Sequence, residues 1–259
     1  MIDLHYAPLF GLFVGLIVGM TGVGGGALLA PILLFFYGLE IKVVIATDLI
    51  FAAITKSIAS TNHIKNSFID WQVVFRLWLG SIPASIIILI LIFYGLSVKS
   101  DLIIKLVGSL IIISGFSMLF SNYAQSKSKL FRHRSPEEFK KFQSPLTIFF
   151  GSVLGTLVTL TSLGAGAIGV IILKLLYPFR MESQKLIGSD TIHAIPLSLV
   201  AGFGFLSMGL VNSDMLIMLL IGSIPGAFIG STYIKGLQPD AVKIILSIVL
   251  IAVGIKIVL

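Results

Sequence analysis

The sequence predicts an all-α membrane protein built from two inverted repeats, each a broken or re-entrant helical hairpin followed by three transmembrane helices. Three observations support this fold class: an apolar composition, uncharged stretches of membrane-spanning length, and motifs that recur after about 140 residues. Two similar halves in an apolar chain are typical of transporters built from structural repeats.

The composition indicates a membrane protein. Of the 259 residues, 57% are hydrophobic and 11% are charged, and the mean hydropathy is +1.09. A soluble domain could not bury so large a share of apolar side chains, so we exclude a soluble enzyme. The chain contains no cysteine, which excludes disulfides, thiolate metal sites and a cysteine nucleophile. We expect a multi-pass protein of the inner or plasma membrane.

Three motifs recur in the same order along the chain. The motif pairs are residues 21–27 with 161–167, 48–52 with 190–194, and 80–83 with 222–225. Chance matching does not keep both the order and the spacing. We therefore divide the chain into an N-terminal repeat (1–121), a basic linker (122–144) and a C-terminal inverted repeat (145–259).

The sequence pattern predicts helices along the whole chain. Spanning helices are predicted near 43–61, 73–95, 103–121, 187–206, 213–234 and 240–258. Residues 6–39 and 142–173 carry no charged side chain, and each stretch exceeds the roughly 20 residues of one crossing. The Thr/Gly motif interrupts each stretch where helix propensity collapses. We interpret each as two shorter helices in a hairpin with the motif at its tip; one long kinked helix is the alternative.

The distribution of Lys and Arg favours the hairpins. If each hairpin returns to its starting side, thirteen of these cations lie on the side of the central linker and four on the other. One crossing per long stretch would split them almost evenly. Because cytoplasmic loops are enriched in Lys and Arg, we expect a cytoplasmic linker and external termini. We also expect the linker to be flexible and to lie near anionic headgroups, without a role in binding nucleic acid.

The two hairpin tips are the candidate substrate site. Glycines permit positive φ, and the helix that follows each motif starts with unpaired backbone N–H groups that favour an anion. Two such helix ends at the repeat interface, with nearby hydroxyls, could bind a small oxyanion. Close helix packing is the alternative role of the glycines. The candidate substrate-binding residues are Thr21, Gly22, Gly24, Gly25, Gly26, Thr161, Ser162, Gly164 and Gly166.

Four ionisable residues lie well inside predicted spans: Asp48, Lys56, Asp190 and His193. Charges there are costly and mark function by default. The two aspartates occupy equivalent repeat positions, and capping a helix N-terminus is their alternative role. Lys56 could contact substrate, pair with a carboxylate, or extend toward the cytoplasmic side. His193 could carry a proton or bond a carbonyl in helix packing. We expect possible coupling to protons through Asp48–Lys56 and Asp190–His193.

These residues resemble the sulfite exporter TauE/SafE family over nearly the whole chain. The first matching elements are Gly15-x3-Gly19-x2-Gly22-x-Gly24-Gly25-Gly26 followed by Pro31, and Ala46-Thr47-Asp48-Leu49-x-x-Ala52-Ala53-Ile54-Thr55-Lys56. The second half adds Gly188-x-Asp190-x-x-His193-Ala194-x-Pro196-Leu197 and Gly222-Ser223-Ile224-Pro225-Gly226. The chain departs from symmetry at Gly164-Ala165-Gly166, where the glycine run is shorter.

The resemblance implies a transporter that exports a small sulfur-containing anion such as sulfite, thiosulfate or an organosulfonate. It agrees with a site made of two opposed helix ends, and alternating access between inverted halves is the expected mechanism. Import of a related anion, a passive channel and an intramembrane enzyme are the alternatives. The chain lacks a His-Glu-x-x-His motif and a clear Ser/His arrangement. We therefore expect no catalysis, no cofactor and no metal; the partners are the anion, the bilayer and possible protons.

Overall fold

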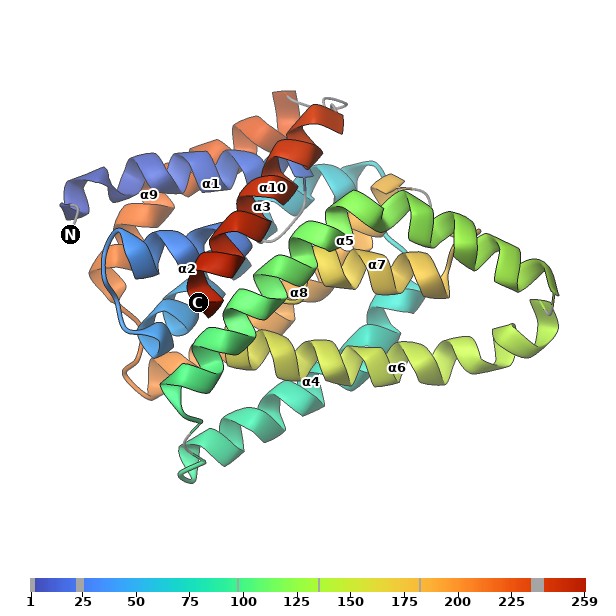
Figure 1. The fold of residues 1–259 in the computed structure, drawn as a ribbon, viewed down its shortest axis with the longest axis horizontal. Coiled ribbons are helices and arrows are strands. Elements are labelled where there is room, and N and C mark those ends of the chain that lie inside the picture. Colours follow the sequence, from blue (N-terminus) through green and yellow to red (C-terminus); the bar gives the residue numbers. More distant parts are fainter. Residues whose placement is uncertain (1–2, 22–25, 97, 135, 182, 234–239) are drawn as a thin grey trace.

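The computed structural model describes residues 3–21, 26–96, 98–134, 136–181, 183–233 and 240–259. Within them the chain forms helices throughout (Figure 1), which confirms the predicted all-α class. A 3-10 helix (η1, Leu4–Tyr6) precedes the α-helices. These are α1 (Ala7–Thr21), α2 (Gly26–Phe35), α3 (Ile41–Lys65), α4 (Trp71–Phe93), α5 (Ser100–Arg134), α6 (Pro136–Thr161), α7 (Ala167–Leu176), α8 (Ser183–Ser207), α9 (Ser213–Tyr233) and α10 (Asp240–Val258).

Seven helices in the described part are long and apolar enough to cross a membrane. They are the stretch Leu4–Thr21, which includes α1, and α3, α4, α8, α9 and parts of α5 and α6. The predicted spans after each hairpin correspond to α3, α4, α5, α8, α9 and α10. A helix of about 20 residues matches the roughly 30 Å hydrocarbon core. The chain is therefore a multi-pass membrane protein.

Both long uncharged stretches are hairpins of two helices, not single kinked helices. At the first hairpin, the Phe10 ring lies 5.5 Å from the Phe36 ring, which joins the start of α1 to the end of α2. At the second, Gln143 Nε2 donates a 2.6 Å hydrogen bond to the Leu176 carbonyl. The hairpins are unequal, however. Their first helices are of spanning length and their second helices have only 10 residues each, whereas we expected two shorter helices.

The basic linker differs from the predicted flexible segment. Helix α5 continues to Arg134 and α6 begins at Pro136, so most of residues 122–144 have a helical backbone. Figure 1 shows α5 and α6 projecting together past the other helices, at the right of the picture. The physical reason is local: residues 117–134 contain no glycine or proline, and several of them have high helix propensity.

Each half packs against the other in an exchanged pattern. Helix α1 packs along α9, and its repeat equivalent α6 packs along α4; α3 packs on α8 and α5 on α10. Small residues allow this contact, since a Cβ at Gly15 would meet the Ser223 backbone and one at Gly222 would meet Pro8. In Figure 1, α1 and α6 run in opposite directions. How the halves are oriented across a membrane stays a prediction.

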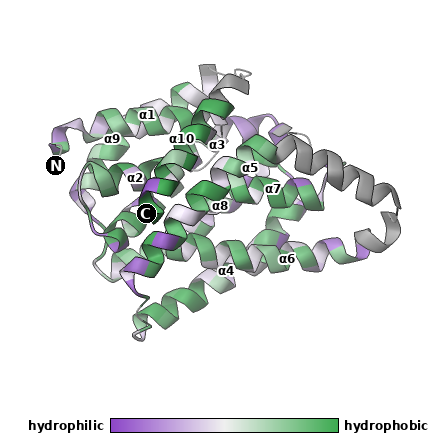
Figure 2. Ribbon diagram, viewed as in Figure 1, coloured by the Kyte–Doolittle hydropathy of each residue, from purple (hydrophilic) through white to green (hydrophobic). Residues whose placement is uncertain are grey.

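The distribution of polarity also fits a lipid environment. Large apolar side chains such as Phe13, Leu79 and Phe149 face outward, and Figure 2 shows hydrophobic residues along most of the helices. The buried residues include charged ones, Asp48 and Lys56 among them. Soluble proteins show the reverse arrangement. Interior charges in a membrane protein mark a substrate or ion site by default.

Two matching caps fix the helices next to the site. Asp70 caps α4 through the Val73 amide, and its own amide donates to Ser189 Oγ at 2.8 Å. Asn212 caps α9 in the same way, and its amide donates to Thr47 Oγ1 at 3.1 Å. The two caps are equivalent in the repeat, because Asp70 and Asn212 are 142 positions apart and so are Thr47 and Ser189. Each cap ties a helix of one half to α3 or α8 of the other half.

Candidate functional site

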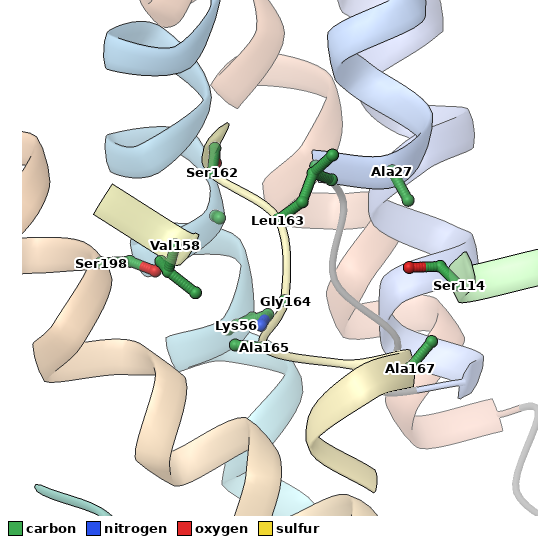
Figure 3. A pocket seen from close by; sticks show the side chains of 12 residues that line it. Ala27, Lys56, Ser114, Val158, Ser162, Leu163, Gly164, Ala165, Ala167 and Ser198 are labelled. Atoms are coloured by element: carbon green, nitrogen blue, oxygen red, sulfur yellow. The ribbon is translucent and has the colours of Figure 1, made fainter. Parts of the chain in front are cut away.

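The start of α2 and the tip of the second hairpin line one small cavity in the interior (Figure 3). Its volume is about 10 Å³, which is room for about one water molecule. Four of its lining residues were predicted site residues: Gly26, Lys56, Ser162 and Gly164. The others are Ala27, Ala52, Ser114, Val158, Leu163, Ala165, Ala167 and Ser198. The lining comes from both halves, from α2, α3, α5, α6, α7, α8 and the second tip.

The second tip is built by its own hydroxyl and glycines. Thr161 Oγ1 donates to the Leu157 carbonyl at 2.6 Å and accepts the Leu163 amide at 3.2 Å. Gly164 and Gly166 have φ values of +122° and +125°, which residues with a side chain rarely adopt. Thr161 thus shapes the tip, and Ser162 and Gly164 line the cavity.

The first tip is described only at its two ends, because Gly22, Gly24 and Gly25 lie outside the described residues. Thr21 Oγ1 donates to the Ile17 carbonyl of its own helix at 2.8 Å. Gly26 begins α2 and leaves no space for a side chain, since a Cβ there would lie 2.6 Å from Asp48 Oδ2. Gly26 therefore lets the start of α2 approach the buried carboxylate and the second tip.

Two helices begin at the cavity. Ala27 in the first turn of α2 and Ala167 at the start of α7 both line it (Figure 3). The first amides of a helix lack partners within the helix, and the helix dipole adds partial positive charge there. The first turns of α2 and α7 thus line the same cavity, and a substrate role for them stays a prediction. Such an arrangement attracts an anion.

Lys56 supplies the only cation among the lining residues. Its side chain is 2% exposed, and it reaches the cavity from the middle of α3. Within the described part of the chain it has no hydrogen bond and no ion pair within 4.0 Å. Asp190 and Asp48 both lie near enough to act electrostatically on the ammonium group. Lys56 is thus a buried cation at the cavity with two carboxylates in its neighbourhood.

The two aspartates are equivalent in sequence but not in bonding. Asp48 Oδ2 accepts a 2.7 Å hydrogen bond from Ser162 Oγ. Neither oxygen of Asp190 makes a hydrogen bond of normal geometry among the described residues, although both are buried; the nearest backbone donor is Gly166, immediately before α7. The repeat equivalent of Ser162 is Gly22, which has no hydroxyl. Each aspartate is the eighth residue of its helix, so neither caps the N-terminus of its own helix.

His193 lies behind the cavity and contacts the neighbouring helix α4. Its Nε2 atom is 2.9 Å from Ser81 Oγ, and its backbone carbonyl accepts a 3.0 Å hydrogen bond from Trp78 Nε1. Its Nδ1 atom is buried without a partner in the described residues. The structure therefore does not pair His193 with Asp190, and it places this ring in helix packing.

Sequence reasoning missed two polar residues of the lining, Ser114 in α5 and Ser198 in α8. Both side chains are almost fully buried, at 4% and 3% exposure. For Ser198 a signal existed, because it stands 142 positions after Lys56, the same separation as between Asp48 and Asp190. Ser114 lies in the uncharged apolar part of α5, and no sequence motif singled it out.

Comparison with known proteins agrees with this architecture. The chain matches the sulfite exporter TauE/SafE family over residues 7–257. It is 35% identical to the probable membrane transporter protein YjnA of Bacillus subtilis, over 96% of this chain and 98% of that protein. The probable membrane transporter protein YdhB of the same organism is 24% identical, over 88% and 89% of the two chains. No solved structure matches the chain. The protein therefore belongs to the sulfite exporter TauE/SafE family of membrane transporters.

Proposed function

We propose that this transporter exports a small sulfur-containing anion, namely sulfite, thiosulfate or an organosulfonate, by alternating access between its two halves. One observation carries the proposal: the starts of α2 and α7 and the buried Lys56 line the same interior cavity. Backbone amides, hydroxyls and a single ammonium group together suit an oxyanion, which accepts hydrogen bonds from several directions. The family description favours sulfur among the oxyanions.

The cavity size indicates how transport would proceed. A volume of about 10 Å³ holds about one water molecule, and a sulfur oxyanion is several times larger. The tips must therefore separate to admit substrate from one side and then from the other. Alternating access by movement of one half against the other around a central site meets this need.

Membrane voltage supports the outward direction. A cell interior is negative, so the exit of an anion is favoured by about 2.3 kcal/mol per charge per 100 mV. Export of this kind needs no other energy source. The proposed direction rests on this voltage argument and on the family to which the chain belongs. The proposed substrate rests on that family and on the donors at the cavity.

Flux in proteoliposomes tests the proposal. Proteoliposomes that contain the wild-type protein are loaded with thiosulfate or sulfite. They should release the anion faster when the membrane potential is negative inside. Lys56→Gln should slow this release about 10- to 100-fold, because a hydrogen bond between charged groups is worth about 1.5–3 kcal/mol. Lys105→Gln is the control, since that exposed side chain pairs only with Asp101 at 3.0 Å.

Two outcomes would contradict the proposed function. Flux of phosphate or carboxylates but of no sulfur anion would refute the substrate class. Conversion of the sulfur compound into another product, without net movement, would indicate an intramembrane enzyme.

A further inference from the structure

Two buried hydroxyls face the cavity without a partner in the protein. Ser114 and Ser198 are 4% and 3% exposed, and both line the cavity. Figure 3 shows their oxygens on opposite sides of it, with the Lys56 nitrogen between them. The described part of the chain offers neither hydroxyl a hydrogen bond. Serines in helices commonly bond their own backbone, as Ser57 does to the Ala53 carbonyl at 2.7 Å.

An unpaired buried hydroxyl is unfavourable unless a ligand or an ordered water satisfies it. Several other buried serines follow the rule: Ser85 accepts from Thr159 at 2.7 Å, and Ser81 contacts His193. Among the described residues, Ser117 and Thr191 are also buried without a hydrogen-bond partner, but only Ser114 and Ser198 line the cavity. Their common location therefore points to a ligand that accepts hydrogen bonds.

The repeat gives Ser198 a specific place in the site. It is the equivalent of Lys56, at the separation of 142 that also relates Asp48 to Asp190 and Thr47 to Ser189. Helices α3 and α8, which carry these two residues, pack on each other. The two halves thus present equivalent positions to the cavity, one with an ammonium group and one with a neutral hydroxyl.

We propose that Ser114 and Ser198 are specificity-determining residues whose hydroxyls donate to oxygens of the transported anion on the two sides away from Lys56. This proposal rests on the proposed function and adds how the anion is selected. A bound oxyanion places one oxygen near the single cation and the others near neutral donors. The site therefore distinguishes anions by their oxygen atoms and not by charge alone. Hydroxyl donors at fixed positions bind anions with strong hydrogen-bond acceptors more tightly than anions with weak ones.

Binding to the purified full-length protein tests the proposal with two probes, thiosulfate and bromide. Bromide has the charge of an anion but is a weak hydrogen-bond acceptor. Ser114→Ala and Ser198→Ala should each weaken thiosulfate binding about tenfold and leave bromide binding within about threefold. Ser198→Thr keeps the hydroxyl and should retain most of the affinity for thiosulfate. Ser85→Ala is the control, because it removes a buried hydroxyl that already has a partner.

The outcomes separate this proposal from the proposed function. Thiosulfate affinity within about threefold of the wild type in both alanine variants would overturn it and leave the two hydroxyls to a bound water. An equal loss for thiosulfate and bromide would overturn it as well, since that pattern reflects a distorted site. If the wild type binds phosphate instead of any sulfur oxyanion, and the variants weaken phosphate, the donor role stands and the proposed substrate is wrong.

Discussion

Asp48 and Asp190 occupy equivalent positions of the repeat but have different neighbours. They are equivalent in sequence and both buried, yet Asp48 accepts a hydrogen bond from Ser162 and Asp190 accepts none of normal geometry among the described residues. The bond also joins the two halves, since Ser162 belongs to the second tip. Asp48 therefore has a structural role in addition to its charge, whereas Asp190 packs against the first turn of α7 at Gly169.

Ser162→Ala should lower stability. It leaves Asp48 Oδ2 as unpaired as Oδ1 already is, and an unsatisfied buried acceptor costs about 1–3 kcal/mol. Thermal unfolding of the purified protein in detergent measures the change. Ser152→Ala on α6, the helix that ends just before Ser162, is the control, because its hydroxyl donates to the Ile148 carbonyl of its own helix at 3.2 Å. An equal shift of the midpoint in both variants would show that the contact with Asp48 adds nothing.

Sequence patterns predicted some site residues and could not predict others, for physical reasons. A charge in an apolar helix stands out, so Lys56 and both aspartates were found. A serine in such a helix does not, because its hydroxyl can bond its own backbone. Only the packing shows that Ser114 and Ser198 lack that bond. The partner of His193 was also out of reach, since Ser81 lies 112 positions away.

At the scale of elements, the breaks in the hairpins were predictable and their proportions were not. Clustered glycines disfavour helix, so the interruptions at the two motifs follow from the sequence. An uncharged stretch does not reveal where a break divides it, and the structure places long α1 and α6 before short α2 and α7. The linker was predicted as flexible from its polarity, but polar residues with good propensity continue α5 and α6 as helices.

One ion pair distinguishes the two ends of the bundle. Arg180, between α7 and α8, donates to both oxygens of Asp70 at 2.6 and 2.8 Å. The equivalent of Asp70 in the other half is the neutral Asn212. The linker side is thus held by a two-point charged contact between the halves, whereas the equivalent cap at the opposite end is neutral. The two caps therefore match in their hydrogen bonds and differ in charge.

Arg180→Gln should destabilise the protein by about 1–2 kcal/mol, because Asp70 is 4% exposed and would keep only the Val73 amide and, at 3.8 Å, Lys185 Nζ among the described residues. The value is moderate since the Arg180 side chain is 42% exposed. Unfolding in detergent checks it against Lys105→Gln, which removes an exposed ion pair and should change stability by less than about 0.5 kcal/mol. Similar midpoints for the two variants would mean that solvent replaces the Arg180 contact.

At the scale of the whole molecule, the orientation in the membrane can be measured directly. The chain has no cysteine, so a single introduced thiol gives no background. Gln184→Cys lies at the linker end of α8 and Ser213→Cys begins α9 at the other end; both positions are exposed. The positive-inside rule predicts labelling of Gln184→Cys from the cytoplasm and of Ser213→Cys from outside. The reverse pattern would refute a cytoplasmic linker.

We expect transport to depend on pH, because buried titratable groups lie in the helices that line the cavity. They are Lys56, which lines the cavity, and Asp48 on α3, and Asp190 and His193 on α8. With both carboxylates ionised, one cation faces two anions, and the resulting field repels an incoming anion. Each proton taken up by a carboxylate reverses part of that repulsion. Anion transport should therefore rise as the pH falls.

Thiosulfate flux in proteoliposomes between pH 5 and 9 measures this dependence, because thiosulfate keeps its charge over that range. The wild-type flux should increase toward pH 5. Asp190→Asn removes one negative charge permanently, so its flux should be higher than that of the wild type at pH 9 and vary less with pH. Asp48→Asn should act in the same direction but also lose stability, since it disturbs the contact with Ser162. If both variants keep the wild-type profile, or if the wild type shows no dependence on pH, the carboxylates are structural and the membrane potential alone drives export.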